Sequence, residues 1–234
     1  HESLQSARRL ANHAEGAGAD AISLVPPAYF RTSSMETLVA GLAYVGEAAP
    51  SLPLYYYHVP RLSGANFRVL DLLQEVKDKV PSFVGVKFSA FEMDDLLRCI
   101  AFEDGLFDIL FGSDEMLLAG MAMGAKGAVG STYNFLGPYY HRVIEAFEAG
   151  RVDEARQHQH AVTCLVHTIL RHGGHPALKA AMGILGKDCG PCRLPISTLT
   201  PHAVEALAGD LHGALHRAGD LPLGLKAKTR FRNV

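Results

Sequence analysis

The sequence has few of the features that mark a specialised class of protein. Four cysteines in 234 residues are too few for a disulfide scaffold, so a reducing cytoplasm is the default localisation. The formal net charge of −2 does not indicate a protein that binds nucleic acid or an anionic membrane. No apolar run approaches the length of a membrane span, and the N-terminus lacks a signal-peptide pattern. With 48% hydrophobic and 20% charged residues, the composition is that of an ordinary globular protein.

The sequence does contain a regular alternation of strands and helices. Short apolar runs predict strands that begin near residues 21, 52, 83, 107 and 125. Helical spacing of apolar residues predicts helices over 2–16, 33–49, 66–79, 92–102 and 114–123. This alternation indicates βαβ units and a parallel sheet. After Val129 only helices are predicted, over 139–149, 153–172, 176–185 and 201–217.

The predicted fold class is α/β, a (β/α)8 TIM barrel that lacks its first three βα units and carries a C-terminal helical extension. Five units do not close a barrel, which needs eight. The chain also begins at His1, already in a helical pattern, which suggests a fragment or a processed chain. The competing fold is an open doubly wound sheet, but no Gly-rich phosphate turn lies near the N-terminus.

Three regions are expected along the chain. Residues 1–150 hold the five βα units of the barrel, and residues 151–217 form the C-terminal helical extension. Residues 218–234 form a short basic tail, for which a solvated, frayed terminus is expected. The total length is about that at which an α/β barrel is still a single domain.

The segment from Phe83 to Ser89 carries the residue most suggestive of chemistry. It predicts a buried parallel strand with one lysine, Lys87, in an otherwise apolar setting. A desolvated amine loses its proton more easily, and a neutral amine attacks ketones to form a Schiff base. On this segment alone, a strand-end lysine whose amine reaches water is the simpler alternative.

Reactive residues of a βα barrel lie where strands end. That rule selects Tyr57 and Lys87, together with the segments 112–115 and 130–134. Tyr57 shares a strand face with Tyr55, and a phenol at this position can relay a proton to or from a substrate oxygen.

The two segments after the later strands supply polar groups. Asp114 and Glu115 begin a predicted helix, where carboxylates are favoured for capping alone, but adjacent carboxylates beside a glycine can also grip the vicinal hydroxyls of a sugar. Ser131 and Thr132 offer hydroxyls and backbone N–H groups suited to a carboxylate or another hydroxyl. Both interpretations, structural and sugar-binding, stay open at this point.

Four segments in this order resemble the N-acetylneuraminate lyases, which belong to the pyruvate-dependent Schiff-base aldolase superfamily shared with dihydrodipicolinate synthase. The segments are Tyr55-Tyr56-Tyr57-His58-Val59-Pro60, Gly85-Val86-Lys87-Phe88-Ser89, Gly112-Ser113-Asp114-Glu115 and Gly130-Ser131-Thr132-Tyr133-Asn134. The tyrosine run and Cys192-Arg193-Leu194-Pro195 resemble the animal form. The resemblance covers nearly the whole chain.

The resemblance implies a (β/α)8 barrel with a helical C-terminal extension, usually a homotetramer, without a metal or an organic cofactor. It implies that Lys87 forms the Schiff base with the keto carbon of sialic acid. Tyr57 then mediates proton transfer as the carbon–carbon bond breaks, which gives N-acetylmannosamine and pyruvate. Gly112, Asp114, Glu115 and Ser131 hold the sugar, Ser89 lies beside the Schiff base, and Tyr29 reaches towards a neighbouring subunit's site.

Two departures qualify what the resemblance implies. Synthases of the superfamily carry a carboxylate-binding arginine five residues after the catalytic tyrosine, but here that position is Leu62, with Arg61 just before it. Because leucine cannot pair with a carboxylate, the lyase is favoured over another pyruvate-dependent aldolase. The superfamily's N-terminal Gly-Thr-Thr-Gly-Glu-type motif is also absent, so the 234-residue chain itself is expected to be inactive or poorly folded. A non-catalytic truncated isoform, which binds a partner through helical surfaces, is the alternative from another class.

Three further motifs suggest other functions. Cys189-Gly190-Pro191-Cys192 is the redox tetrapeptide of thioredoxins, but it lacks the preceding strand and following helix that this chemistry needs. His160, Cys164 and His167 share a helical face with zinc-ligand spacing, without further residues to complete a site. The segment 124–130 resembles a phosphate loop only loosely. Each is better explained by local structure.

Overall fold

The computed structural model describes residues 2–219. The predicted basic tail, from residue 220 on, lies outside the described residues. Two compact units are formed, one by residues up to 113 with 119–129, the other by residues 114–118 with those from 130 on. No helix within residues 2–219 combines the length and the apolar character needed to cross a membrane. The division into barrel and extension near residue 150 stays a prediction.

The first unit is built on a five-stranded parallel sheet whose strands follow one another in chain order. The strands are β1 (Ile22–Leu24), β2 (Leu54–His58), β3 (Phe83–Phe88), β4 (Asp108–Phe111) and β5 (Gly127–Ala128). All five predicted strands are present. Together with the helices that follow them, they confirm the α/β fold class predicted from the sequence.

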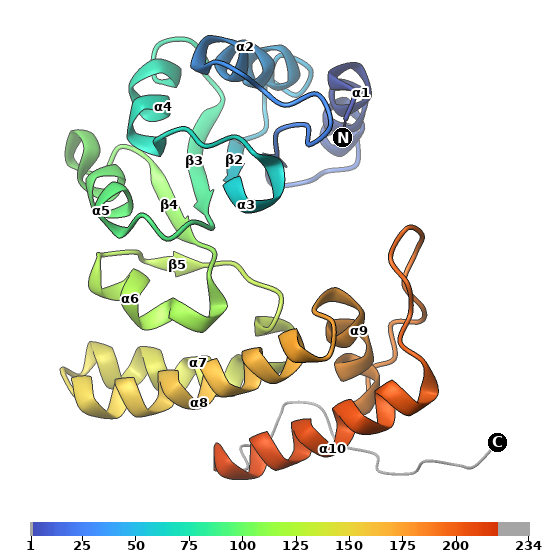
Figure 1. Ribbon diagram of the computed structural model, residues 1–234. Coiled ribbons are helices and arrows are strands. Elements are labelled where there is room, and N and C mark those ends of the chain that lie inside the picture. The colour runs from blue at the N-terminus through green and yellow to red at the C-terminus, as the bar shows by residue number, and fades with distance from the viewer. Residues whose placement is uncertain (1, 220–234) are drawn as a thin grey trace. The chain divides into compact units, whose positions relative to one another are not determined.

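Helices connect the strands and lie alongside the sheet (Figure 1). They are α1 (Leu4–Gly16), α2 (Met35–Gly46), α4 (Val69–Val76) and α5 (Met93–Ala101), with the short α3 (Pro60–Ser63) and the 3-10 turn η1 (Phe102–Asp104) between them. The side chains of Ser3 and Ser34 accept hydrogen bonds from the N–H groups of Ser6 and Thr37. These caps satisfy donors at the helix N-termini. The α3 helix was not predicted, because four residues are too few to show a helical period.

Alternation along β2 separates the two faces of the sheet. Leu54, Tyr56 and His58 are buried, whereas Tyr55 and Tyr57 are only half-buried. A strand directs successive side chains to opposite faces, so one face is packed against the helices and the other stays more open. Burial of the packed face drives the assembly of this unit.

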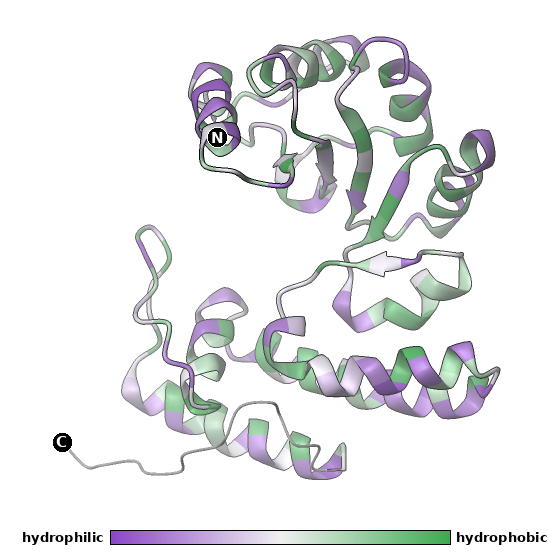
Figure 2. Cartoon of the chain, turned by 180° about the vertical axis from the view of Figure 1, so that it is seen from behind, coloured by the Kyte–Doolittle hydropathy of each residue, from purple (hydrophilic) through white to green (hydrophobic). Residues whose placement is uncertain are grey.

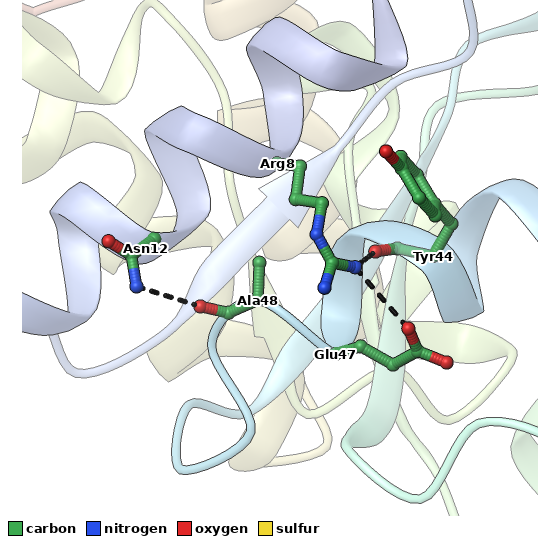
Figure 3. Close-up of polar contacts among 5 residues, drawn as sticks. All are labelled: Arg8, Asn12, Tyr44, Glu47 and Ala48. Atoms are coloured by element: carbon green, nitrogen blue, oxygen red, sulfur yellow. Dashed lines mark hydrogen bonds and ion pairs between the residues drawn. The ribbon is translucent and has the colours of Figure 1, made fainter.

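Polar contacts join α1 to α2 at the rim of the first unit (Figure 3). The Arg8 guanidinium donates to the carbonyl of Tyr44, and its Nη1 lies 3.3 Å from Glu47 Oε2. Asn12 Nδ2 donates to the carbonyl of Ala48 over 3.4 Å. Both acceptor carbonyls lie near the C-terminal end of α2, where a helix leaves carbonyls without a partner of its own. The side chains of α1 therefore supply donors to the end of its neighbour.

The second unit is helical. It contains η2 (Asp114–Met116) and the later helices α7 (Tyr133–Glu148), α8 (Val152–Arg171), α9 (His175–Ile184) and α10 (Pro201–Arg217). The helix α6 (Leu117–Ala122), which precedes β5, begins in this unit and ends in the first. Helices α7 and α8 pack on each other and carry both hydrophilic and hydrophobic stripes (Figure 2). The buried positions between these helices include Val143, Val162 and Leu165.

Helix α7 begins earlier than the sequence indicated. The prediction of a start at residue 139 was wrong, because the helix begins at Tyr133 and contains Pro138. Proline removes one helical hydrogen bond and crowds the preceding turn. Here it lies in the second turn from the N-terminus, and buried neighbours such as Phe135 and Leu136 stabilise the turn before it through packing.

Candidate active site

Lys87 and Tyr57 lie next to each other at the open face of the sheet. They are paired in register on β3 and β2, so their side chains leave the sheet on the same side. Lys87 Nζ lies 4.0 Å from the centroid of the Tyr57 ring, which is a cation–π distance when the amine is protonated. The structure therefore brings together the two residues to which the sequence analysis assigned chemistry.

Both neighbours of Lys87 along the strand fix its direction. Val86 and Phe88 are fully buried on the packed face, so Lys87 between them is directed to the open face. Rotating the strand would expose both apolar side chains, at about 25 cal/mol for each Å² of apolar surface. The position of the amine thus follows from burial of the residues that flank it.

Backbone and side-chain hydrogen bonds link the carboxyl ends of three strands. Ser89 N donates to the carbonyl of His58 over 2.8 Å, and Gly112 N donates to the carbonyl of Phe88 over 2.8 Å. Ser89 Oγ donates to the carbonyl of Gly112 over 3.1 Å. A Cβ at position 112 would lie 1.9 Å from Ser89 Oγ, so only glycine permits this approach. Ser89 and Gly112, both predicted site residues, are therefore adjacent.

Tyr55 shares the open face with Tyr57 but has a different partner. Its hydroxyl donates to Asp108 Oδ2 on β4 over 2.9 Å, across the intervening Gly85. Desolvation is the main cause that raises the pKa of Tyr55, and the hydrogen bond to Asp108 adds to it. The phenol proton of Tyr55 is thus committed to a carboxylate. The sequence showed that the two tyrosines share a face but gave no sign of this contact.

The loop after β2 shows how Arg61 and Leu62 are placed. Leu62 is 68% exposed, and the guanidinium carbon of Arg61 lies 5.5 Å from the ring centroid of Phe91. Both residues belong to the short α3. The guanidinium is therefore held by an aromatic ring of the next loop.

Asp114, in the second unit, is the most constrained of the predicted sugar-binding residues. It is only 8% exposed, and its Oδ2 accepts hydrogen bonds from Thr132 N over 2.8 Å and from Thr132 Oγ1 over 2.6 Å. The Thr132 hydroxyl in turn bonds to the hydroxyl of Tyr140. A Cβ at Gly130 would lie 1.5 Å from Asp114 Oδ1. This carboxylate thus accepts its hydrogen bonds from another segment rather than from the helix it begins.

The remaining predicted residues have less defined surroundings. Glu115 is half-buried, and its carbonyl accepts a hydrogen bond from Thr163 Oγ1 over 3.0 Å. Ser131 is exposed, and its carbonyl accepts from Asn134 Nδ2 over 2.8 Å. Ser131 was the predicted member of its segment, but the contact with Asp114 is made by Thr132.

Tyr29 lies on the surface of the first unit. Its side chain is 81% exposed, and its ring packs edge-on against Phe30 with centroids 4.8 Å apart. The N–H groups of Ala28 and Tyr29 donate to the carboxylate of Glu2, and these bonds lower the pKa of Glu2. The backbone of the turn is thereby fixed while the phenol itself projects outward.

The motifs set aside in the sequence lie in ordinary surroundings. Cys189 to Cys192 occupy irregular backbone after α9, with free thiols, rather than the N-terminus of a helix. His160, Cys164 and His167 are exposed on α8. Within residues 2–219, no three His, Cys, Asp or Glu side chains gather in a way that would hold a metal ion.

Comparison with known proteins gives consistent matches. The sequence model of the dihydrodipicolinate synthetase family matches residues 1–214. The N-acetylneuraminate lyase of Xenopus tropicalis is 44% identical over 196 residues, which are 83% of this chain and 64% of that protein. The N-acetylneuraminate lyase of Homo sapiens is 39% identical over 197 residues, 83% of this chain and 62% of that protein. This chain therefore spans less than two thirds of the length of these relatives.

Solved structures match over a larger share of the chain. The Proteus mirabilis N-acetylneuraminate lyase superposes with a TM-score of 0.88 at 34% identity, over 92% of this chain and 72% of that one. The N-acetylneuraminate lyase, or sialic acid aldolase, of Aliivibrio salmonicida gives 0.87 at 33% identity, over 91% and 70%. These similarities agree with the predicted TIM-barrel class.

Proposed function

The chain belongs to the dihydrodipicolinate synthetase family, and from that premise we propose that it acts as a Schiff-base lyase on N-acetylneuraminate. The products are N-acetylmannosamine and pyruvate. The observation that carries the proposal is the contact between Lys87 and Tyr57, a nucleophile and a proton carrier that meet on neighbouring strands. The names of the relatives supply the substrate.

The proposed chemistry begins at the Lys87 amine. Its nitrogen attacks the keto carbon of the open-chain sugar acid, water leaves, and a protonated imine results. A base removes the proton of the hydroxyl whose oxygen lies three bonds from the imine carbon. The carbon–carbon bond to the carbon that carries this hydroxyl then breaks, and its electron pair moves towards the imine to form an enamine. Protonation and hydrolysis then release pyruvate and return the amine. Tyr57 is proposed to carry the proton in the cleavage step.

The other predicted residues are proposed to bind substrate. Ser89 lies one position beyond the strand that carries Lys87 and is fixed to Gly112, which supports a place beside the Schiff base. Gly112, Asp114, Glu115 and Ser131 are proposed to hold the sugar. The exposed Tyr29 is proposed to reach the site of a neighbouring subunit in a homotetramer. The proposal requires neither metal nor organic cofactor, and a cytoplasmic location is part of it.

Another pyruvate-dependent aldolase activity is the alternative within the same family. Arg61 would have to reach a substrate carboxylate for a synthase-like reaction, and its contact with Phe91 opposes that movement. The lyase reaction makes no such demand on Arg61 or on Leu62.

Reductive trapping tests the proposed nucleophile. Borohydride is added in the presence of pyruvate, and the adduct is located by peptide mapping with mass spectrometry. Since the chain spans 64% of the Xenopus tropicalis relative, the assay uses the chain alone and a chimera that adds the relative's unmatched residues. We expect the adduct on Lys87, and a Lys87→Met variant of each version provides the control.

The outcomes separate the hypotheses. An adduct on Lys87 together with release of N-acetylmannosamine from N-acetylneuraminate supports the lyase. An adduct without sugar cleavage indicates another aldolase of the family. A folded chimera that forms no adduct on Lys87 would remove the Schiff-base assignment.

A further inference from the structure

We propose that Thr132 and Tyr140 are positioning residues that set the direction of the Asp114 carboxylate, so that one of its oxygens is presented to the hydroxyls of the sugar. The inference rests on the proposed function, in which Asp114 binds that sugar. All three residues belong to the second unit. The family resemblance assigned sugar binding to neither Thr132 nor Tyr140.

The two oxygens of Asp114 have different surroundings. Oδ2 accepts two hydrogen bonds from one residue, from the N–H and the hydroxyl of Thr132 at 2.8 and 2.6 Å. Oδ1 lies over the Cα of Gly130, where any side chain would collide with it. Two donors on a single oxygen fix the rotation of the carboxylate. No donor in the described part of the chain bonds to Oδ1, so this oxygen is left to meet a ligand.

Tyr140 fixes the hydroxyl of Thr132 in turn. The two hydroxyls are in hydrogen-bond contact, and the Tyr140 ring packs on Tyr133 with centroids 4.0 Å apart. Tyr140 is 1% exposed. Its pKa is raised mainly by desolvation and further by the charge of Asp114, so the phenol keeps its proton over the working pH range. A packed, protonated tyrosine is a rigid partner for the threonine.

Hydrogen bonds connect the packed Tyr140 side chain, through the Thr132 hydroxyl, to the charged oxygen of Asp114. Hydrogen bonds to an ionised carboxylate are the strong ones, and they depend on direction. A binding group must be held within roughly half an ångström of its productive geometry, and its neighbours do this. Within residues 2–219 no cationic side chain pairs with Asp114, so the N–H and hydroxyl of Thr132 supply the donors that a cation would otherwise provide.

The test compares matched threonine variants in the version of the protein that cleaves sialic acid. Thr132→Val keeps the shape and the backbone N–H but removes the hydroxyl, while Thr132→Ser keeps the hydroxyl. Thr168→Val is the control, because Thr168 is equally buried but donates only to the carbonyl of Cys164 in its own helix. For the phenol, Tyr140→Phe is compared with Tyr56→Phe, because the Tyr56 hydroxyl has no hydrogen-bond partner in the part of the chain that the structure describes.

We expect Thr132→Val to raise the KM for N-acetylneuraminate about tenfold, which corresponds to ~1.4 kcal/mol. Tyr140→Phe should raise it less, by about threefold, and Thr132→Ser should restore it. Trapping of pyruvate on Lys87 should be unchanged in every variant, since pyruvate lacks the sugar. The two control variants should leave the KM unchanged.

Two results would overturn the inference. One is a folded Thr132→Val variant whose KM stays within about twofold of the parent's. The other is an equal rise in Thr168→Val, which would make the effect one of general packing. If the parent itself traps no pyruvate, the proposed function has failed, and calorimetric binding of N-acetylmannosamine then decides this inference. The inference then requires that Thr132→Val weaken the binding of N-acetylmannosamine about tenfold. It is contradicted if N-acetylmannosamine does not bind to the parent.

Discussion

The two faces of β2 show how different the surroundings of identical residues can be. Tyr55, Tyr56 and Tyr57 follow one another in the sequence, yet only Tyr56 is fully buried. Its hydroxyl has no hydrogen-bond partner among residues 2–219, and desolvation alone raises its pKa. Tyr55 donates to Asp108, and the Tyr57 ring lies beside the amine of Lys87. Residue type therefore indicates little about the role of each tyrosine, and the face of the strand indicates much more.

The charged side chains of these strands lie on the open face of the sheet rather than on the packed face. On the packed side His58 lies between the rings of Tyr56 and Phe88, and no described residue is a hydrogen-bond partner of its Nδ1. On the open side Lys87, Asp108 and two phenols are accessible. Changes on the open face should therefore alter chemistry, and changes on the packed face should alter the free energy of unfolding.

The largest effect is expected from the open face. Tyr57→Phe should lower kcat for sialic acid cleavage by about 10²- to 10⁴-fold, the usual contribution of a positioned acid–base group. The free energy of unfolding should change little, since the ring is retained. Steady-state kinetics and urea unfolding measure the two quantities. A Tyr57→Phe variant with unchanged kcat would show that another group carries the proton.

A smaller effect, on stability, is expected from His58 on the packed face. Desolvation lowers the pKa of His58 from 6.5 to about 4, against the opposing charges of Asp95 and Glu92. Between these two values the unfolded chain binds a proton that the folded chain does not, so the free energy of unfolding falls as the pH drops from about 6.5 to about 4. The full loss is ~3 kcal/mol at 1.36 kcal/mol for each pKa unit.

Urea unfolding at several pH values between 4 and 7 measures this dependence. A His58→Phe variant should lose the part of the acid dependence that His58 causes. If the parent and the variant lose stability in parallel on acidification, another group is responsible.

The smallest effects should differ in sign between two neighbouring tyrosines. Tyr55→Phe removes a hydrogen bond to an exposed carboxylate and should destabilise by about 0.5–1 kcal/mol. Tyr56→Phe removes a buried hydroxyl that has no partner, so it should be neutral or stabilising by up to about 1 kcal/mol. Urea midpoints of the two variants give the comparison. Equal destabilisation by both would contradict the assignment of the two faces.

The strands and the lysine were predictable because their signals are local. Apolar runs bounded by Pro or Gly predict all five strands, and the period of two in a strand places Tyr55 and Tyr57 on one face. The order of the strands follows from their spacing, since short βαβ connections place neighbours side by side. Lys87 was found because a charged residue within such a run is rare.

The contacts of Asp114 were not predictable, because they depend on packing between distant segments. Thr132 lies 18 residues from Asp114, and Tyr140 contacts Thr132 only because α7 begins at Tyr133. The predicted start at residue 139 left Thr132 well before the helix, whereas Thr132 directly precedes its first residue, Tyr133. Ser131 and Thr132 are chemically similar, and the sequence gives no means of choosing which hydroxyl faces the carboxylate.

Gly85 couples two strands that are not neighbours. A Cβ at this position would lie 2.1 Å from the carbonyl oxygen of Asp108 and 2.8 Å from Cε1 of Tyr55. The missing side chain is therefore what allows the tyrosine on β2 to cross β3 and reach β4. In evolutionary terms, we expect the residues at positions 55 and 108 to vary together and position 85 to stay glycine. A lineage that loses the tyrosine at 55 leaves the carboxylate at 108 free to change, but the backbone carbonyl of residue 108 still excludes a side chain at 85.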